Sequence, residues 1–384
     1  MIENGLFYLV SIISLVAIAL WIEKRLNWRI FSYLPVIVLL YIITMILANI
    51  GIWSSSGEIN SLYKDFKSYL LPAMILVLLL GSNIKAISLL SKSLIGVFVL
   101  SSFSIALGFI LAYLIFSPYL PQDAWRTLAA LCGSWMGGTV NMVAIGDALG
   151  VTEEQMGFAL IADSLNYTIW VSLLLLLIPF APLFNKWTNA SMVNFEQIVA
   201  TPTITPKKNR WHIQIIGMIA IFLVAKMILW LASLLPQIDF FSQTTWVVLI
   251  STTIAIIGSL FAWARYLPLW LGKPLLYLLI ALIASQASLG SFTQAPLYIA
   301  FGTTVLVVHL VLMLLFAKIF KLNLFSLGVA SLANIGGVAS APILAGAYAQ
   351  NLVPIGVIMA MMGYIVGTFG GLAVGKILFF IASY

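Results

Sequence analysis

Two short glycine-rich segments contain the residues whose types and spacing could bind a ligand. Gly137-Gly138 and Gly336-Gly337 each lie in a run of small residues inside an otherwise apolar segment. Glycine permits a positive φ and a close approach of backbone to ligand, while helix-start N–H groups attract anions and freed carbonyl groups coordinate cations. The polar side chains beside the two pairs are Ser134, Thr139, Asn141, Ser331, Asn334 and Ser340. We predict that these segments bind a small solute or an ion; helix packing through small residues is the alternative.

Asp163 is a carboxylate placed about eight residues inside the next apolar segment. A carboxylate at that depth costs several kcal/mol unless it is paired, protonated or hydrated. Asn166 lies three residues later and therefore shares its helix face. The pair could hold a proton or a cation, which makes Asp163 the candidate ligand for Na⁺. The alternative is a buried carboxylate that is hydrogen-bonded to a neighbouring helix.

Other polar residues within or beside apolar segments have simpler interpretations. Asp147 lies near Glu153-Glu154 and is read as a solvated carboxylate at the rim. Lys226 interrupts an apolar segment, but its stem can carry the ammonium toward the membrane surface. Asn83 and Gln286 occupy comparable places in the two halves of the chain and could line a cavity or join helices.

The composition is that of a polytopic membrane protein. Of the 384 residues, 63% are apolar and 8% are charged, against about 45–50% and about 25% in soluble domains. The single cysteine, Cys132, excludes an internal disulfide and a multi-cysteine metal site, and His212 and His309 lie far apart. We expect no enzyme activity, because an intramembrane enzyme would need a nucleophile with a base, or a metal pair, and Asp163 stands alone at that depth. We expect no cofactor other than Na⁺ or H⁺ as the coupling ion. We expect no nucleic-acid partner, because the basic residues behind the net charge of +7 are scattered over short loops.

Twelve segments have the length and apolar character of membrane-embedded elements, for which about 20 residues per helix are needed. They are 5–22, 33–53, 69–84, 94–117, 125–150, 155–179, 211–235, 244–263, 271–288, 295–317, 324–349 and 353–376. The longest polar stretch divides them into six and six. In each half the fifth segment contains the double glycine and the sixth follows after a short polar break. Such internal symmetry is typical of a transporter repeat.

The fold prediction is an all-α polytopic membrane protein with two inverted-topology repeats of about five transmembrane helices. The repeats are residues 1–180 and 211–384, joined by a cytoplasmic linker at 181–210. Each repeat also contains a re-entrant hairpin or broken helix, at about 125–150 and about 324–350. A hairpin that enters and leaves on one side gives each half five crossings, so the second half is inverted.

The distribution of basic residues favours this topology. Two hairpins and ten crossings place thirteen of the eighteen basic residues on the cytoplasmic side, with both termini outside. Twelve full crossings would place the linker and two later basic loops on the opposite side. A broken helix that crosses fully is the alternative to the hairpin. The thirteen residues are Lys24, Arg25, Arg29, Lys85, Lys92, Lys186, Lys207, Lys208, Arg210, Arg265, Lys273, Lys318 and Lys321, and the main exceptions are Lys64 and Lys67.

Three motifs resemble those of the YjcL-type integral membrane family of unassigned function: WIEKR at 21–25, GSWMGGTVNMVA at 133–144 and ANIGGVASAP at 333–342. This family is more distantly similar to a superfamily of sodium/glutamate, sodium/citrate and bile-acid symporters and cation/proton antiporters. The resemblance implies an inverted-repeat carrier, often dimeric, in which a core domain moves against a scaffold. It implies a site at the two double glycines. Asp163 resembles the acidic position of the antiporters, but Ser164 stands where a second acid would be expected.

We therefore expect a secondary active transporter of the plasma (inner) membrane. It would move a small polar or anionic organic solute, coupled to Na⁺ or H⁺, by alternating access. A cation/proton antiporter that uses Asp163 is the first alternative, and a passive channel is the second, although no charged ring or repeated filter motif is visible. The expected partners are the lipid bilayer, the solute and a second copy in a homodimer.

Overall fold

The computed structural model describes the chain except residues 1, 27–35, 55, 82–86, 88–89, 191–210, 238–240, 288–293, 350–351 and 384. Apart from one isolated bridge between Ile2 and Trp53, the described residues form helices and turns and no strand. The prediction of an all-α protein is therefore confirmed. Asn83, Lys85 and most of the linker predicted at 181–210 lie outside the described residues.

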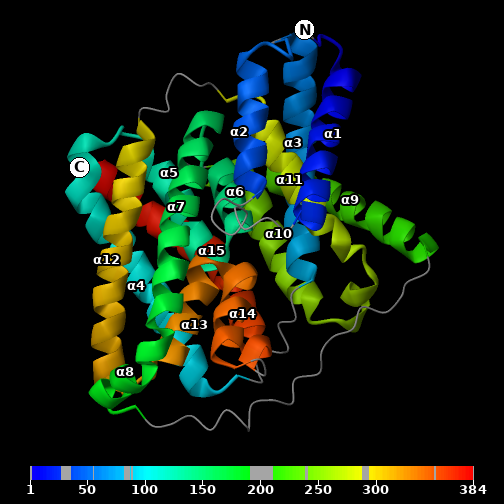
Figure 1. The fold of residues 1–384 in the computed structure, drawn as a ribbon. Coiled ribbons are helices and arrows are strands. Elements are labelled where there is room, and N and C mark those ends of the chain that lie inside the picture. Colours follow the sequence, from blue (N-terminus) through cyan, green and yellow to red (C-terminus); the bar gives the residue numbers. More distant parts are fainter. Residues whose placement is uncertain are drawn as a thin grey trace. The chain divides into compact units, whose positions relative to one another are not determined.

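The helices follow the same order in both halves of the chain (Figure 1). The first half contains α1 Gly5–Leu26, α2 Val36–Asn49, α3 Gly57–Leu80, α4 Lys92–Phe116, α5 Ala124–Gly137, α6 Thr139–Ala148 and α7 Glu153–Leu177. The second half contains α9 Trp211–Ser233, α10 Gln243–Ser259, α11 Gly272–Ala284, α12 Ala295–Phe320, α13 Leu324–Ile335, α14 Gly337–Tyr348 and α15 Val353–Ala382. Between the halves, α8 Ala181–Thr188 occupies the first part of the predicted linker, which is therefore helical there.

Each predicted apolar segment contains a helix, and the ends follow local capping chemistry. The third helix, α3, begins well before the predicted residue 69, because the Ser56 hydroxyl accepts a hydrogen bond from the Ile59 N–H and caps a polar first turn. Ser91 caps α4 and Asn323 caps α13 in the same manner. The fifth segments at 125–150 and 324–349 are each two helices, α5–α6 and α13–α14.

Six of the described helical segments are long and apolar enough to cross a membrane. They are Gly5–Arg25, Lys92–Tyr119, Glu153–Thr188, Trp211–Ser233, Ala295–Phe320 and Val353–Ala382. Four shorter apolar helices accompany them, among them α2 and α10. Of the ten predicted crossings, six therefore correspond to described helices that are long and apolar enough to span a membrane.

Contacts divide the chain into two compact units that do not coincide with its halves. The first unit comprises Met1–Gly81, Gly146–Leu165 and Lys207–Tyr298, and the second comprises Ser82–Ile145, Asn166–Pro206 and Ile299–Tyr384. In the first unit α3 packs against α9, α10 and α11, and α11 also packs against α1 and α2. In the second unit α15 packs against α4, α5, α13 and α14. Each unit therefore takes its main helices from both halves.

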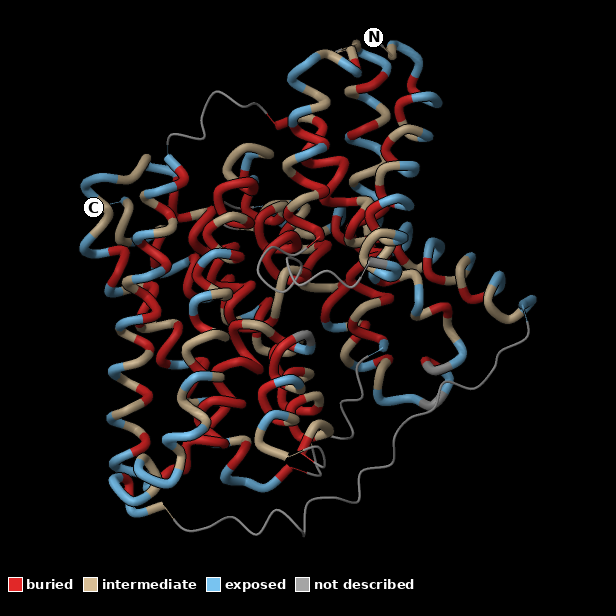
Figure 2. Tube along the Cα trace, viewed as in Figure 1, coloured by how far each residue is buried: buried red, intermediate tan, exposed pale blue. Residues whose placement is uncertain are grey.

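The first arms of the two broken elements, α5 and α13, form the interior of the second unit. Every residue of α13 is buried, and so is all of α5 except Arg126 (Figure 2). Non-helical backbone at membrane depth is tolerated only where protein or water surrounds it. The ends of α5 and α13 satisfy this condition.

Candidate functional site

The first glycine break separates α5 from α6. Gly138 has φ +93° and ψ 173°, and its N–H donates to the Ser134 carbonyl oxygen at 2.6 Å. A side chain rarely adopts this φ, so Gly138 is the residue that permits the turn. After the turn the chain folds back on itself, since a Cβ added to Gly133 would overlap Ile145 and lie 3.5 Å from the Asn141 carbonyl oxygen. The two arms of this broken element therefore lie side by side.

The second break separates α13 from α14 in the same way. Gly337 has φ +57°, and the Gly336 N–H donates to the Leu332 carbonyl oxygen at 3.0 Å. The arms again lie side by side (Figure 1), because the rings of Phe325 and Tyr348, near the far ends of α13 and α14, are 5.3 Å apart between centroids. Both double glycines thus turn the chain back within one broken element.

The two breaks share a side-chain arrangement in which the glycines have different tasks. The second glycine supplies the positive φ. The first supplies space, because a Cβ on Gly137 would overlap the Asn141 amide nitrogen and a Cβ on Gly336 would overlap the Ser340 hydroxyl oxygen. In both cases the polar residue four positions later folds over the first glycine. The sequence pattern is Gly-Gly-x-x-Asn in one half and Gly-Gly-x-x-Ser in the other.

These two polar side chains are buried and incompletely hydrogen-bonded. Asn141 and Ser340 are each 1% exposed. The Asn141 Oδ1 accepts from the Thr368 hydroxyl at 2.8 Å, but its Nδ2 has no partner among the described residues, and neither has Ser340 Oγ. A buried donor or acceptor left unsatisfied costs about 1–3 kcal/mol. Each break thus holds a polar atom that a bound ligand could satisfy.

The two breaks come together at Gly363 of α15, within the second unit. A Cβ on Gly363 would lie 2.9 Å from the Met136 carbonyl oxygen and 3.2 Å from the Ala333 carbonyl oxygen. These oxygens, one at the end of each first arm, are therefore no more than about 6 Å apart. The carbonyl groups in the last turn of a helix accept no hydrogen bond within that helix. They lie at the negative end of the helix dipole. Two such ends near one point attract a cation.

Asn334 and Ser331 are buried but have structural hydrogen bonds. The Asn334 Oδ1 accepts from the Ser102 hydroxyl at 2.7 Å, and its Nδ2 donates to the Ala330 carbonyl oxygen at 3.0 Å. Ser331 Oγ accepts from Trp170 Nε1 and lies 2.8 Å from His309 Nε2. These side chains join α13 to α4, α7 and α12. The structure therefore brings both residues close to the second break but gives them partners within the protein.

The candidates Ser134 and Thr139 lie at the first break itself. Ser134 is 1% exposed and lies in the last turn of α5. Thr139 is half-buried and is the first residue of α6. They border Gly137 and Gly138 on either side of the turn.

Asn166 and Asp163 lie on α7 but belong to different units. Asn166 is fully buried in the second unit, where its Nδ2 donates to the Ile299 carbonyl oxygen at 3.2 Å and its Oδ1 accepts from the Thr303 hydroxyl at 2.9 Å. Its amide thus connects α7 to α12. Asp163 is half-buried and belongs to the first unit. Among the described residues, no three His, Cys, Asp or Glu side chains gather in a group that could hold a metal ion.

Asp147 is not the solvated rim carboxylate that the sequence suggested. Its Oδ1 lies 2.6 Å from Lys67 Nζ, and the two side chains are only 16% and 19% exposed. Tyr63 donates to Glu153 Oε1 at 2.7 Å beside this pair, and burial together with Glu153 holds the pKa of Tyr63 above its usual value, so the phenol remains a donor. The same ion pair provides a partner for Lys67, one of the two lysines that the predicted topology places outside.

Sequence reasoning missed the glycine face of α15. Gly363 and Gly367 lie against Gly137, and a Cβ on Gly371 would be 2.8 Å from the Gly133 Cα. Thr368, on the same helix, holds Asn141. The signal was present as glycine at every fourth position from Gly363 to Gly375, a pattern that lets helices approach closely in membranes.

The fold and these breaks define a multi-pass integral membrane protein that is helical over its described residues and whose helices are interrupted at two double glycines. The family model described as "Protein of unknown function (DUF819)" matches residues 10–381, and the chain belongs to this family. It is similar to the uncharacterized membrane protein YjcL of Bacillus subtilis (strain 168), with 23% identity over 383 residues that cover 94% of this chain and 93% of that protein. The resemblance to a YjcL-type family of unassigned function is confirmed.

Proposed function

We propose that this protein is a secondary active transporter that binds its solute and coupling ion at the two glycine breaks. The observation that carries the proposal is the convergence of both breaks on Gly363, with Asn141 Nδ2 and Ser340 Oγ buried and unpartnered among the described residues. Paired interruptions in corresponding positions of two halves are the best sequence pointer to a transporter's binding site. The solute is a small polar or anionic organic molecule.

The chemistry of the breaks supports binding of both an ion and a solute. The Met136 and Ala333 carbonyl oxygens approach one another at the negative ends of α5 and α13, which suits Na⁺. The starts of α6 and α14 offer N–H groups to an anionic group of the solute. Asn141 Nδ2 is a further donor. Coupling follows when the ion and the solute bind the same conformation more tightly together than separately.

The proposal includes a topology. We propose two inverted repeats of five crossing helices, with both broken elements re-entrant, both termini outside and the protein in the plasma membrane. Alternating access would then arise from movement of the second unit, which contains both breaks, relative to the first. A homodimer would give the first unit a fixed partner in the bilayer.

The decisive experiment is thermal unfolding of the detergent-purified protein, titrated with Na⁺ against choline at equal ionic strength and then with a panel of amino acids, short peptides and dicarboxylates. A ligand that binds only the folded protein stabilises it by about 2.7 kcal/mol at a hundredfold excess over its Kd. We expect a Na⁺-specific rise in the midpoint and a further rise from one solute class. Asn141→Ala should lose this response.

Asn49→Ala is the matched control for this experiment. The Asn49 amide lies in the first unit and donates to the Ala287 carbonyl oxygen at 2.9 Å. Its loss should lower the midpoint but leave the Na⁺ and solute responses unchanged. If neither Na⁺, pH nor any solute shifts the wild-type midpoint, or if both variants keep the full response, the glycine breaks are packing elements and the proposal fails.

A cation/proton antiporter that uses Asp163 is the second candidate. It is supported by the position of this carboxylate within α7, which belongs to a segment long and apolar enough to cross a membrane. Asp163→Asn should then abolish the collapse of an imposed pH gradient by Na⁺ in proteoliposomes. A passive channel would instead conduct in the wild type and in Asp163→Asn alike, without any gradient of a second ion.

A further inference from the structure

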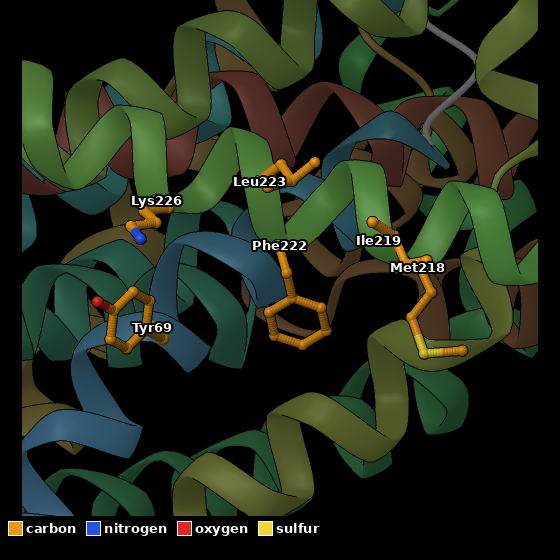
Figure 3. Close-up of a pocket in the computed structure, with 6 residues that line it drawn as sticks. All are labelled: Tyr69, Met218, Ile219, Phe222, Leu223 and Lys226. Carbon is orange, nitrogen blue, oxygen red and sulfur yellow. The ribbon is translucent and has the colours of Figure 1, made fainter.

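A groove in the first unit lies between α3 and α9 and has a chemistry that the transport proposal does not use. Its volume is about 470 Å³. The lining residues are Tyr69, Met218, Ile219, Phe222, Leu223 and Lys226 (Figure 3). The Lys226 nitrogen and the Tyr69 oxygen lie together at one end, whereas Met218 lies at the other. The groove is therefore apolar along its length and polar at one end only.

Lys226 is an exposed cation on an apolar helix. It belongs to Trp211–Ser233, which is long and apolar enough to cross a membrane. None of the ion pairs formed by the described residues includes Lys226, and the same part of the chain gives it no hydrogen-bond partner. An unpaired ammonium within a membrane span is unfavourable unless it reaches the surface or meets an anion. The groove thus begins at a cation that has no counter-ion among the described residues.

The charged end of the groove lies nearer to the end of α9 than its apolar end does. Lys226 is seven residues before the end of α9, about 10 Å along the axis at 1.5 Å per residue. From Lys226 the groove extends about 12 Å back to Met218 and passes the middle of the helix, which falls at Phe222. A lysine stem can carry its ammonium several Å toward the nearer helix end. A phosphate paired with Lys226 would therefore lie on that side of α9, and an acyl chain would run over Phe222.

We propose that this groove binds one anionic phospholipid. The Lys226 ammonium pairs with the phosphate, the Tyr69 hydroxyl donates to a phosphate oxygen, and an acyl chain packs on Met218, Ile219 and Phe222. A charge-assisted contact of this kind is stronger than a neutral hydrogen bond. The proposal is independent of the transport activity, since none of the residues that line the groove belongs to the two glycine breaks.

Lys376 provides a matched control within the same chain. It is an exposed lysine on α15, six residues before the end of another span that is long enough to cross a membrane. It has no ion-pair or hydrogen-bond partner within the described residues, and it does not line the groove. Lys226→Met and Lys376→Met therefore remove the same charge at nearly the same distance from a helix end.

The test is native mass spectrometry of the detergent-purified full chain, incubated with dioleoyl-phosphatidylglycerol or dioleoyl-phosphatidylcholine. We expect the wild type and Lys376→Met to retain one phosphatidylglycerol that Lys226→Met binds at least tenfold more weakly, with no such difference for phosphatidylcholine. Ile219→Trp keeps the charge but fills the groove, so it should weaken retention as well. This variant keeps the proposal testable if Lys226→Met does not fold.

Three results would overturn the proposal. Equal losses in Lys226→Met and Lys376→Met would indicate general attraction of anionic lipid to a basic protein. A rise in thermal midpoint with inorganic phosphate equal to that with phosphatidylglycerol would show that the acyl chain contributes nothing. Self-association of the wild type through this face, detected by light scattering and lost in Ile219→Trp, would identify a second copy as the occupant.

Discussion

The two glycine breaks have the same backbone construction but different neighbours. At the first break, Gly137 packs directly on the backbone of Gly363, and Thr368 of the same helix holds the Asn141 side chain. At the second break, the atoms around Gly336 are side-chain atoms, those of Ser340 and Tyr167. Backbone neighbours cannot move without shifting a helix, whereas side chains can change rotamer.

The polar residues differ in the opposite sense. The first break has one half-satisfied amide, Asn141, which follows the turn. The second has satisfied groups before the turn, Ser331 and Asn334, and an unsatisfied hydroxyl after it, Ser340. The residues before the second turn thus secure α13 in the protein, whereas Asn141 and Ser340, which follow the turns, each keep one polar atom without a partner among the described residues. The first break is therefore the more closely packed by backbone, and the second is the better anchored by side-chain hydrogen bonds.

The largest expected difference concerns the first glycine of each pair. In Gly137→Ala the new methyl group would overlap the Gly363 carbonyl group, so α5 and α15 must separate. Overpacking of this kind costs about 1–3 kcal/mol, and more where backbone must move; we expect about 3 kcal/mol or more. Gly336→Ala meets only side-chain atoms and should cost about 1 kcal/mol. Thermal unfolding in detergent measures both, and equal losses would show that the breaks are equally rigid.

The second difference concerns the anchoring of α13. Ser331→Ala leaves Trp170 Nε1 and His309 Nε2 without their shared partner, and each unsatisfied buried group costs about 1–3 kcal/mol. We expect the free energy of unfolding to fall by about 2–4 kcal/mol. Cys132→Ala is the control, because Cys132 stands at the corresponding position before the first break and is fully buried. Removal of this small apolar group in Cys132→Ala should lower the free energy of unfolding by about 1 kcal/mol. A larger effect at Cys132 would reverse the assignment of the anchor.

The third difference lies at the far ends of the two broken elements. The last turn of α6 is tied to α3 by the Lys67–Asp147 ion pair, whereas α13 and α14 meet through the rings of Phe325 and Tyr348. Because both charges are largely buried, Lys67→Met should cost about 1–2 kcal/mol, between exposed and fully buried pairs. Lys64→Met, an exposed neighbour, should cost nothing measurable. Thermal midpoints of the single and double variants with Asp147→Asn test this, and additive losses would contradict a direct pair.

The smallest expected effect on stability has the clearest functional meaning. Ser340→Ala removes a buried hydroxyl that has no partner in the described part of the chain, so the midpoint without ligand should stay the same or rise slightly. If a ligand uses this hydroxyl, its affinity should fall about 3–10-fold, the value of one hydrogen bond of about 0.5–1.5 kcal/mol. Ser233→Ala, an exposed serine bonded within α9, should change neither quantity. A fall in midpoint with unchanged affinity would make Ser340 a structural residue.

The sequence predicted the helices and the positions of the breaks well, because both are local signals. Apolar segments of suitable length and double glycines are visible without any tertiary information. The partners of polar residues were not predictable, because Asn334 bonds to Ser102 and Asn141 to Thr368, more than 200 positions away. Spacing alone therefore grouped Ser331, Asn334 and Ser340 as equivalent candidates. The structure distinguishes them by which polar atoms already have partners.

The glycine face of α15 illustrates the same limit. Its four-residue period was readable from the sequence, but a period does not reveal which helix it faces. Asp147 and Lys67 were likewise assigned separately, as a solvated carboxylate and a misplaced cation, although each accounts for the other. The ion pair, which spacing along the sequence does not reveal, accounts for the positions of both residues.

The burial of Cys132 has a practical consequence for labelling studies. This residue is the chain's single cysteine and is fully enclosed in α5, so thiol reagents that require an exposed thiolate should not reach it in the folded protein. The unmodified protein should therefore give no labelling signal of its own with such reagents. Single cysteines introduced along α6, α14 and the loops between helices can be probed with reagents added to either side of a vesicle, which would map sidedness without first removing a native thiol.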